Sequence, residues 1–295
     1  MPPLARRDVR SLVRKLGATA RPSQQREAVA AIQELLSCDG DWDSRAAVVA
    51  AGAIPPLVEL LRAGTSVEVQ VNAAGALGAL AYNAESSVAI AAAGAIPPLV
   101  QLLGSGSPAD VREKAARALR NLAGKNADNA DDIAHSVGIP LLVALLRPDS
   151  PAATQELAAG ALCNLAQNEL LHVTIVTAGA IPPLVQLLGH GCPAGVQAIA
   201  AGALSNLAVS AANHVAIASA GAIAPLVQLL RPGSTAQVQR FAAVALKFLA
   251  AKAENAVSIA AAGAIPALLD LWGSGPGDTK LAASQALEAL VRREP

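Results

Sequence analysis

Three asparagines, Asn121, Asn164 and Asn206, recur along the chain at steps of 43 and 42 residues. A side-chain amide offers N–H donors and a carbonyl acceptor, which match the C=O and N–H groups of an extended polypeptide backbone. Asn costs helix propensity relative to Ala, so its regular return within helical stretches indicates a role that offsets this cost. The spacing predicts a ladder of amides that bind a peptide backbone, bond a neighbouring helix, or do both.

The residues one helical turn before these asparagines differ in size. Arg117 precedes Asn121, and we interpret it as a partner either for an acidic group of a ligand or for Glu113 at i−4 on its own helix. Gly160 and Gly202 precede the other two asparagines. They either leave the floor of a groove open for a bulky ligand side chain or allow neighbouring helices to approach closely. These three residues and the asparagines are the candidate binding residues for a peptide or partner.

The remaining reactive residue types form no catalytic or metal-binding pattern. The cysteines are odd in number and far apart, which favours a reducing compartment and hence the cytoplasm, the nucleus or both. The histidines lack the paired spacing of a closed zinc site; they are His135, His172, His190 and His214. The glycine stretches GSGSP, GHGCP and GSGPG lack the lysine of a phosphate-binding loop. We therefore expect no enzyme, no cofactor, no metal and no small-molecule substrate.

The elements that position these residues follow from an internal repeat. The phrase GAIPPLVQLL occupies 94–103 and returns unchanged at 179–188, and GAIPPLVELL stands at 52–61. Its isoleucine recurs in steps of 42 or 43 residues, at Ile54, Ile96, Ile139, Ile181, Ile223 and Ile265. Each unit predicts three helices, and no unit can bury its apolar face alone, so neighbours must stack. The sequence predicts an all-α fold, a solenoid of three-helix repeats.

Polar residues and glycines predict where the first helix of each unit begins and ends. We expect N-terminal caps in one column, with Asn168 replacing a cap where Leu171 interrupts it; the column is Ser44, Ser86, Asn129, Asn213 and Asn255. We expect the helix to end at a left-handed glycine, at Gly52, Gly94, Gly138, Gly179, Gly221 and Gly263. Proline follows within a few residues, where the first turn of the next helix tolerates it.

The ends of the chain predict the domain organisation. We expect residues 1–295 to form a single solenoid. Residues 1–43 would be a partial N-terminal capping repeat with an irregular insertion at 37–44. Residues 44–295 would hold six full repeats of about 42 residues, the last with a C-terminal capping helix. Terminal repeats with a polar outer face are what keeps a solenoid soluble.

Composition limits the partners. Apolar residues make up 53% of the chain but aromatic residues only 2%, so the core is built from Ala, Leu, Val and Ile. Net charge is zero, so we expect no nucleic acid partner. A basic cluster near the N-terminus is either a solvated helix face or a binding patch. The apolar run at 88–100 is too short for a membrane span and is interrupted by Gly94 and two prolines.

The repeated motifs resemble those of the armadillo repeat family. The resemblance rests on GAIPPLV at 94–100 with ALRNLA at 118–123, and on GAIPPLV at 179–185 with ALSNLA at 203–208. It covers essentially the whole chain. It implies a right-handed superhelix whose third helices line a concave groove for extended peptides or partner proteins. The expected function is a protein-interaction scaffold, monomeric as an isolated domain.

Comparison within the family leaves alternatives open. Importin α-like adaptors carry a Trp one turn before the Asn of each third helix. Here that column holds Gly75, Arg117, Gly160, Gly202, Val244 and Gln285, so a nuclear-import role lacks its aromatic slots. VRSLVRKL followed by QREAVAAIQELL is similar to the armadillo region of plant-type U-box ubiquitin ligases, which implies substrate recognition. A structural subunit of a large assembly is the third alternative.

Overall fold

The computed structural model describes residues 6–37, 42–62 and 64–291. Within these residues the secondary structure is helical, with an isolated bridge between Pro232 and Ser234 and no extended strand. The predicted all-α fold is confirmed. The chain divides into two compact units, Met1–Leu141 and Leu142–Pro295.

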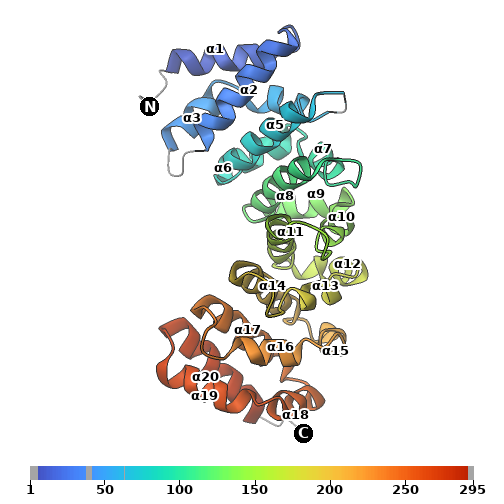
Figure 1. The fold of residues 1–295 in the computed structure, drawn as a ribbon, viewed down its shortest axis with the longest axis vertical. Coiled ribbons are helices and arrows are strands. Elements are labelled where there is room, and N and C mark those ends of the chain that lie inside the picture. Colours follow the sequence, from blue (N-terminus) through green and yellow to red (C-terminus); the bar gives the residue numbers. More distant parts are fainter. Residues whose placement is uncertain (1–5, 38–41, 63, 292–295) are drawn as a thin grey trace. The chain divides into compact units, whose positions relative to one another are not determined.

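The first unit begins with a helix pair and continues with sets of three helices (Figure 1). The pair is α1 (Arg6–Leu16) and α2 (Pro22–Leu36). One set is α3 (Trp42–Ala50), α4 (Ile54–Glu59) and α5 (Val67–Leu80). The next is α6 (Ala84–Ala92), α7 (Ile96–Gln101) and α8 (Ala109–Ala123), followed by α9 (Ala127–His135). Helix α10 (Gly138–Ala144) spans the boundary between the units.

The second unit repeats this order. It contains α11 (Ala152–Leu165), then the short 3₁₀ helix η1 (Glu169–Leu171) with α12 (His172–Thr177), α13 (Ile181–Gln186) and α14 (Ala194–Leu207). The following set is η2 (Ala211–Asn213) with α15 (His214–Ser219), α16 (Ile223–Leu229) and α17 (Ala236–Leu249). The last is α18 (Ala253–Ala261), α19 (Ala264–Ser274) and α20 (Gly277–Val291).

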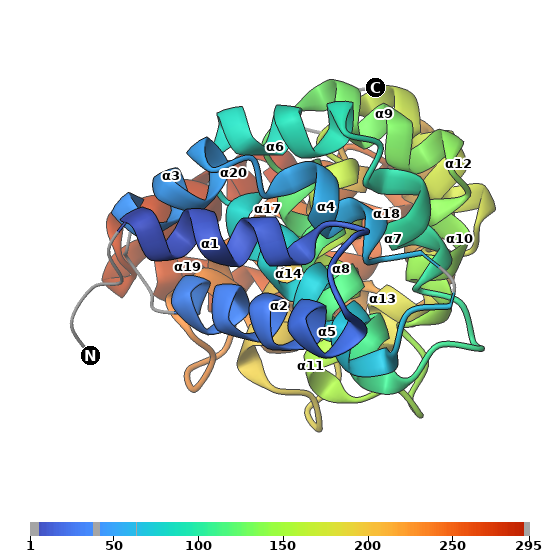
Figure 2. The same cartoon turned by 90° about the horizontal axis from the view of Figure 1, so that it is seen from above.

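The third helices of successive repeats stack directly on one another. In the first unit α2 packs on α5 and α5 on α8, and in the second unit α11, α14, α17 and α20 form a similar row. The residues between these helices are mostly Ala and Leu; Ala73, Ala76 and Leu77 of α5, for example, are completely buried. Small side chains let the helix axes approach closely, and each buried leucine contributes about 1.5–3 kcal/mol. In Figure 2, α2 and α5 lie on the opposite side of the first unit from α6 and α9.

The repeated phrase ends one helix and starts the next, as predicted. Gly52, Gly94, Gly179, Gly221 and Gly263 have positive φ angles, between 77° and 84°. Prolines occupy the first turn of α4, α7 and α13, where no intrahelical N–H is required. Leu99 and Leu184 from the same phrase are fully buried. The glycine therefore supplies the turn, and the leucine anchors the restarted helix.

The prediction for Gly138 is wrong. The left-handed residue at this junction is Val137, with a φ of 61°, and Gly138 begins α10. Counted from the repeated isoleucine, Val137 occupies the position that glycine holds elsewhere. Gly138 is small for another reason: a Cβ there would lie 2.7 Å from the carbonyl oxygen of Ile133.

The predicted capping column is wrong at Ser86 and Asn129, because the caps there lie three residues earlier. Asn83 accepts a hydrogen bond from the backbone N–H of Ser86, and Asn126 accepts one from that of Asn129. The substitute cap Asn168 is confirmed by its bond from Leu170 N–H. Residues of the column itself lie inside or at the start of the helices, namely Ser44, Ser86, Asn129, Asn213 and Asn255. Two of them make other bonds: Asn129 donates to Ser87 Oγ, one repeat earlier, and Asn213 donates across the turn to the Leu207 carbonyl.

The apolar run at 88–100 is divided between α6 and α7, with Gly94 in the turn that separates them. No single helix in the described ranges has the length and hydropathy needed to cross a membrane. Two pairs reach these values only when their helices are taken together, and both are sharply bent at the break, by 117° in one pair and 79° in the other. These pairs are Ala194–Leu207 with Ala211–Ser219, and Ala253–Ala261 with Ala264–Ser274.

Candidate functional site

Two of the three predicted asparagines, Asn121 and Asn206, bond the preceding third helix. Asn121 Nδ2 donates to the carbonyl of Gly78 at 2.8 Å, and Asn206 Nδ2 donates to the carbonyl of Cys163 at 3.0 Å. In both pairs the partners are 43 residues apart, which is one repeat. The neighbouring-helix alternative is thus observed for Asn121 and Asn206. An amide has a second N–H and a carbonyl oxygen, so these half-buried side chains keep capacity for a peptide backbone. Asn164 is also half-buried, on α11.

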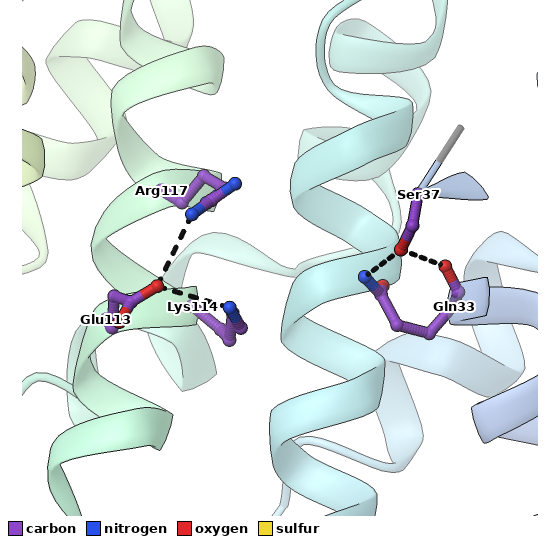
Figure 3. A network of polar contacts seen from close by, with 5 residues as sticks. All are labelled: Gln33, Ser37, Glu113, Lys114 and Arg117. Atoms are coloured by element: carbon purple, nitrogen blue, oxygen red, sulfur yellow. Dashed lines mark hydrogen bonds and ion pairs between the residues drawn. The ribbon is translucent and has the colours of Figure 1, made fainter. Parts of the chain in front are cut away.

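Arg117 makes the local ion pair that the sequence allowed. Its Nη2 lies 3.3 Å from Oε1 of Glu113, and Lys114 Nζ lies 3.1 Å from the same oxygen. Figure 3 shows this group on α8 and, on the other side of α5, the Gln33 and Ser37 side chains at the end of α2. Gln33 Nε2 donates to Ser37 Oγ, whose hydroxyl donates to the Gln33 carbonyl. One carboxylate oxygen therefore serves two cations, and Arg117 remains about half exposed.

The glycines of the candidate set do not all leave open space. A Cβ at Gly202 would lie 3.3 Å from Cys163 Sγ and 3.6 Å from the Phe241 ring. Close approach of neighbouring third helices is therefore the role that the structure gives Gly202, in place of an open groove floor. Gly160 is buried in α11.

A cavity of about 360 Å³ lies over α5, and we refer to it as the α5 cavity. Its floor consists of small residues of α5, namely Gly75, Gly78 and Ala79. One wall is the end of α2, with Gln33, Leu36 and Ser37, and the other is α8, with Lys114, Arg117 and Asn121. Arg45 and Tyr82 complete the lining. Two of the predicted residues, Arg117 and Asn121, are thus brought together in one place.

The α5 cavity borders an aromatic and cationic cluster. The rings of Trp42 and Tyr82 are 5.9 Å apart between centroids. The guanidinium of Arg45 lies 5.2 Å from the Trp42 centroid and 5.6 Å from that of Tyr82, and Lys125 Nζ lies 4.9 Å from Tyr82. Such contacts contribute about 0.5–1 kcal/mol each at exposed sites. They hold Arg45 in place, with the ring faces occupied by the chain's own cations.

Sequence reasoning missed Gln33, Arg45 and Tyr82. None of them belongs to a column that repeats every 42 residues, so the periodicity of the sequence does not reveal them. The scarcity of aromatic residues offers another signal, since a chain with two Trp, one Tyr and two Phe makes each ring informative. In the second unit, Arg240 lies over Phe241 and Lys247 over Phe248, both at 4.7 Å.

Two buried histidines have structural partners. His172 Nε2 lies 2.8 Å from the carbonyl of Ala166, and His214 Nε2 lies 2.8 Å from that of Ala208, six residues earlier in both cases. Cys192 is half-buried, with Sγ 4.0 Å from the Gln186 carbonyl. Cys38 lies outside the described residues. Among those that are described, no group of three or more His, Cys, Asp or Glu side chains is placed to hold a metal ion.

Comparison with known families and structures agrees with this architecture. The armadillo/β-catenin-like repeat model matches residues 43–82, 126–167 and 173–209, and a HEAT-like repeat model matches 67–122. A designed armadillo repeat protein, solved in complex with the peptide (KR)4, is 30% identical with a TM-score of 0.72. The match covers 80% of this chain and 99% of the designed one. The chain belongs to the armadillo repeat family.

Other solved structures are also similar to this chain. An engineered protein is 34% identical with a TM-score of 0.87, covering 96% of this chain and 68% of the other. A second designed armadillo repeat protein is 26% identical with a TM-score of 0.66, covering 96% and 99%. Comparison with curated proteins found no match. The armadillo fold is an α-solenoid that typically serves as a non-enzymatic protein-binding scaffold.

Proposed function

We propose that this armadillo protein is a non-enzymatic scaffold that binds an extended peptide, or a peptide-like segment of a partner protein, on its third helices. The observation that carries the proposal is the α5 cavity, which three successive third helices form together. It presents the Asn121 amide beside cationic side chains. A designed relative was solved in complex with the peptide (KR)4, which supports the same use here.

An extended peptide fits this surface better than a globular ligand does. The small floor residues Gly78 and Ala79 allow a backbone to approach α5 closely. The walls, one repeat away on either side, supply hydrogen-bonding groups at intervals along the stack. Affinity would come from many modest contacts, with a few anchors dominating.

The test compares two crosslinking positions on the full chain. A photoreactive p-benzoylphenylalanine replaces either Tyr82, which lines the α5 cavity, or Val88, which is comparably exposed on the first helix α6. Peptides from a random dodecapeptide library selected on the unmodified chain are then crosslinked to each variant. We expect labelling from position 82 and little from position 88. Labelling from 88 alone, or a library that yields no binder, would refute the proposal.

The proposal also includes the type of partner, the oligomeric state and the cellular location. We propose a protein or peptide partner, no nucleic acid, a monomeric isolated domain, and a cytoplasmic or nuclear location. Substrate recognition for a ubiquitin ligase would use the same third-helix surface and stays a prediction. A structural subunit or an import adaptor stays a lesser alternative, and crosslinks from the first helices would favour the structural one.

A further inference from the structure

The α5 cavity has an excess of positive charge. Arg45, Lys114 and Arg117 line it, and the carboxylate beside them is Glu113, which pairs with Lys114 and Arg117. Among the described residues, three cations against one carboxylate leave a net charge of +2 at a site that is partly shielded from water. Within the described residues no carboxylate pairs with Arg45.

In the described part of the chain, two polar atoms at the same site are buried without a hydrogen-bond partner. They are Nε of Arg45, a donor, and Oε1 of Gln33, an acceptor. Buried polar groups are nearly always bonded, so unsatisfied ones at a single cavity call for a specific explanation. The Gln33 amide lies directly over Gly75, because a Cβ there would be 2.7 Å from Oε1. A ligand that accepts from Arg45 and donates an N–H to Gln33 would satisfy both, after side-chain rotations that turn these two buried atoms toward the cavity.

Arg45 is held in place for such a ligand. Its guanidinium is near the faces of Trp42 and Tyr82, and stacking on rings leaves the N–H groups at the guanidinium edge free to form a fork for a carboxylate or phosphate. Lys114 adds a point charge from the opposite wall. The volume of about 360 Å³ is within the usual range of ligand sites.

We infer that the α5 cavity binds an anionic side chain, carboxylate or phosphate, of an extended peptide. This inference rests on the proposed function and specifies the charge of the partner. It also sets this chain apart from the designed relative solved with (KR)4, since a basic peptide would meet like charges here. The peptide backbone supplies the N–H for Gln33, and the acidic group takes the place of Glu113 in part of its ion pairing.

The test uses four labelled nonapeptides that differ in two central residues: Glu-Glu, phosphoserine-phosphoserine, Gln-Gln and Lys-Lys. In a Trp272→Phe background Trp42 is the single tryptophan, and its fluorescence reports on the Arg45 contact. We expect saturable changes in Trp42 fluorescence with the two acidic peptides. Their relative affinities identify carboxylate or phosphate as the better ligand. Equal binding of the Gln-Gln or Lys-Lys peptide, or no saturable binding of any peptide, would overturn the inference.

Variants with opposite expected effects separate recognition from structural damage. Lys114→Gln with Arg117→Gln should weaken the Glu-Glu peptide about tenfold or more, because charge-assisted bonds are lost. Glu113→Gln should tighten it severalfold by releasing both cations. Arg62→Gln, which removes an exposed cation paired with Glu59 outside the cavity, should change nothing. Circular dichroism checks the fold, and unchanged affinity in the double variant would also overturn the inference.

The outcomes of this test and of the crosslinking test are distinguishable. If neutral peptides still crosslink at position 82 while the charge variants have no effect, the third helices bind peptides but the cavity has no preference for anions. If no peptide crosslinks there, the proposed function fails as well.

Discussion

The side chain of Asn121 donates a hydrogen bond to the backbone carbonyl of Gly78, one repeat earlier on the adjacent third helix. Asn206 makes the equivalent bond to Cys163 in the second unit. An amide in this position connects neighbouring repeats directly, which explains why Asn is used within a helix despite its lower propensity. The same amide lines the α5 cavity in the first unit, so inter-repeat bonding and peptide contact involve one residue.

Asn121→Ala should lower stability relative to a matched Asn→Ala variant that breaks no bond. Asn72 on α5 is the control, because no side-chain hydrogen bond joins it to the described residues. Both variants gain the helix propensity of Ala, but only Asn121→Ala loses the bond to Gly78, a loss of about 1 kcal/mol. The free energies of unfolding of the two variants, measured by urea denaturation, should differ by that amount. Equal midpoints would show that the inter-repeat bond does not stabilise the fold.

Val137→Gly should stabilise the first unit. A β-branched residue with a φ of 61° is strained, and the left-handed conformation costs a non-glycine residue about 1–2 kcal/mol. Val137 is 62% exposed, so little buried contact is lost. Greater flexibility of the unfolded chain offsets part of the gain, which leaves an expected increase of about 1 kcal/mol by urea unfolding.

The reverse change serves as the control for this strain. Gly94 has a φ of 77° and open space around its missing Cβ, so Gly94→Val should destabilise through backbone strain alone, by about 1–2 kcal/mol. If Val137→Gly is neutral while Gly94→Val destabilises, the Val137 conformation is compensated by contacts of its own.

The helices could be predicted from sequence because residues at equivalent positions have the same structural role in successive repeats. Leu99 and Leu184 are buried alike, and the glycines before them adopt the same left-handed turn. The predictions are wrong where the position of a residue within the repeat does not determine which contact its side chain makes. Asn129 lies in a polar column that predicts a cap, yet its amide donates to Ser87 one repeat earlier while Asn126 caps the helix. Both asparagines suit a cap chemically, and tertiary contacts decided between them.

The candidate site was predictable only in part. Arg117 and Asn121 lie in repeating columns and were found, whereas Arg45 follows the irregular insertion and Tyr82 stands outside any column. Whether the space beside a glycine is open or filled also depends on side chains of the neighbouring helices. Phe241 and Cys163 enclose Gly202, while Gln33 partly covers Gly75 and leaves the α5 cavity beside it. Pairwise contacts between repeats set these outcomes, and a single repeat does not contain them.

The cap assignment can be tested directly with two neighbouring alanine substitutions. Asn83→Ala should destabilise by about 1 kcal/mol, because the Ser86 N–H at the start of α6 loses its acceptor. Ser86→Ala should have a smaller effect, since its backbone N–H still bonds Asn83. Urea unfolding measures both. A larger loss for Ser86→Ala would restore the column that the sequence suggested.

Core substitutions should report whether the two units unfold separately. Leu99→Ala in the first unit and Leu184→Ala in the second each remove a fully buried side chain, at a cost of about 2–5 kcal/mol. Stability in repeat arrays is a sum of local and nearest-neighbour contributions, so a defect acts most strongly near its own position.

Trp42 lies in the first unit and Trp272 in the second, which provides one fluorescent reporter for each. In single-tryptophan variants, Leu99→Ala should lower the unfolding midpoint seen by Trp42 more than that seen by Trp272, and Leu184→Ala should do the reverse. Identical shifts at both reporters would mean that the array unfolds as one cooperative unit, because the loss at either position would then be shared by every repeat.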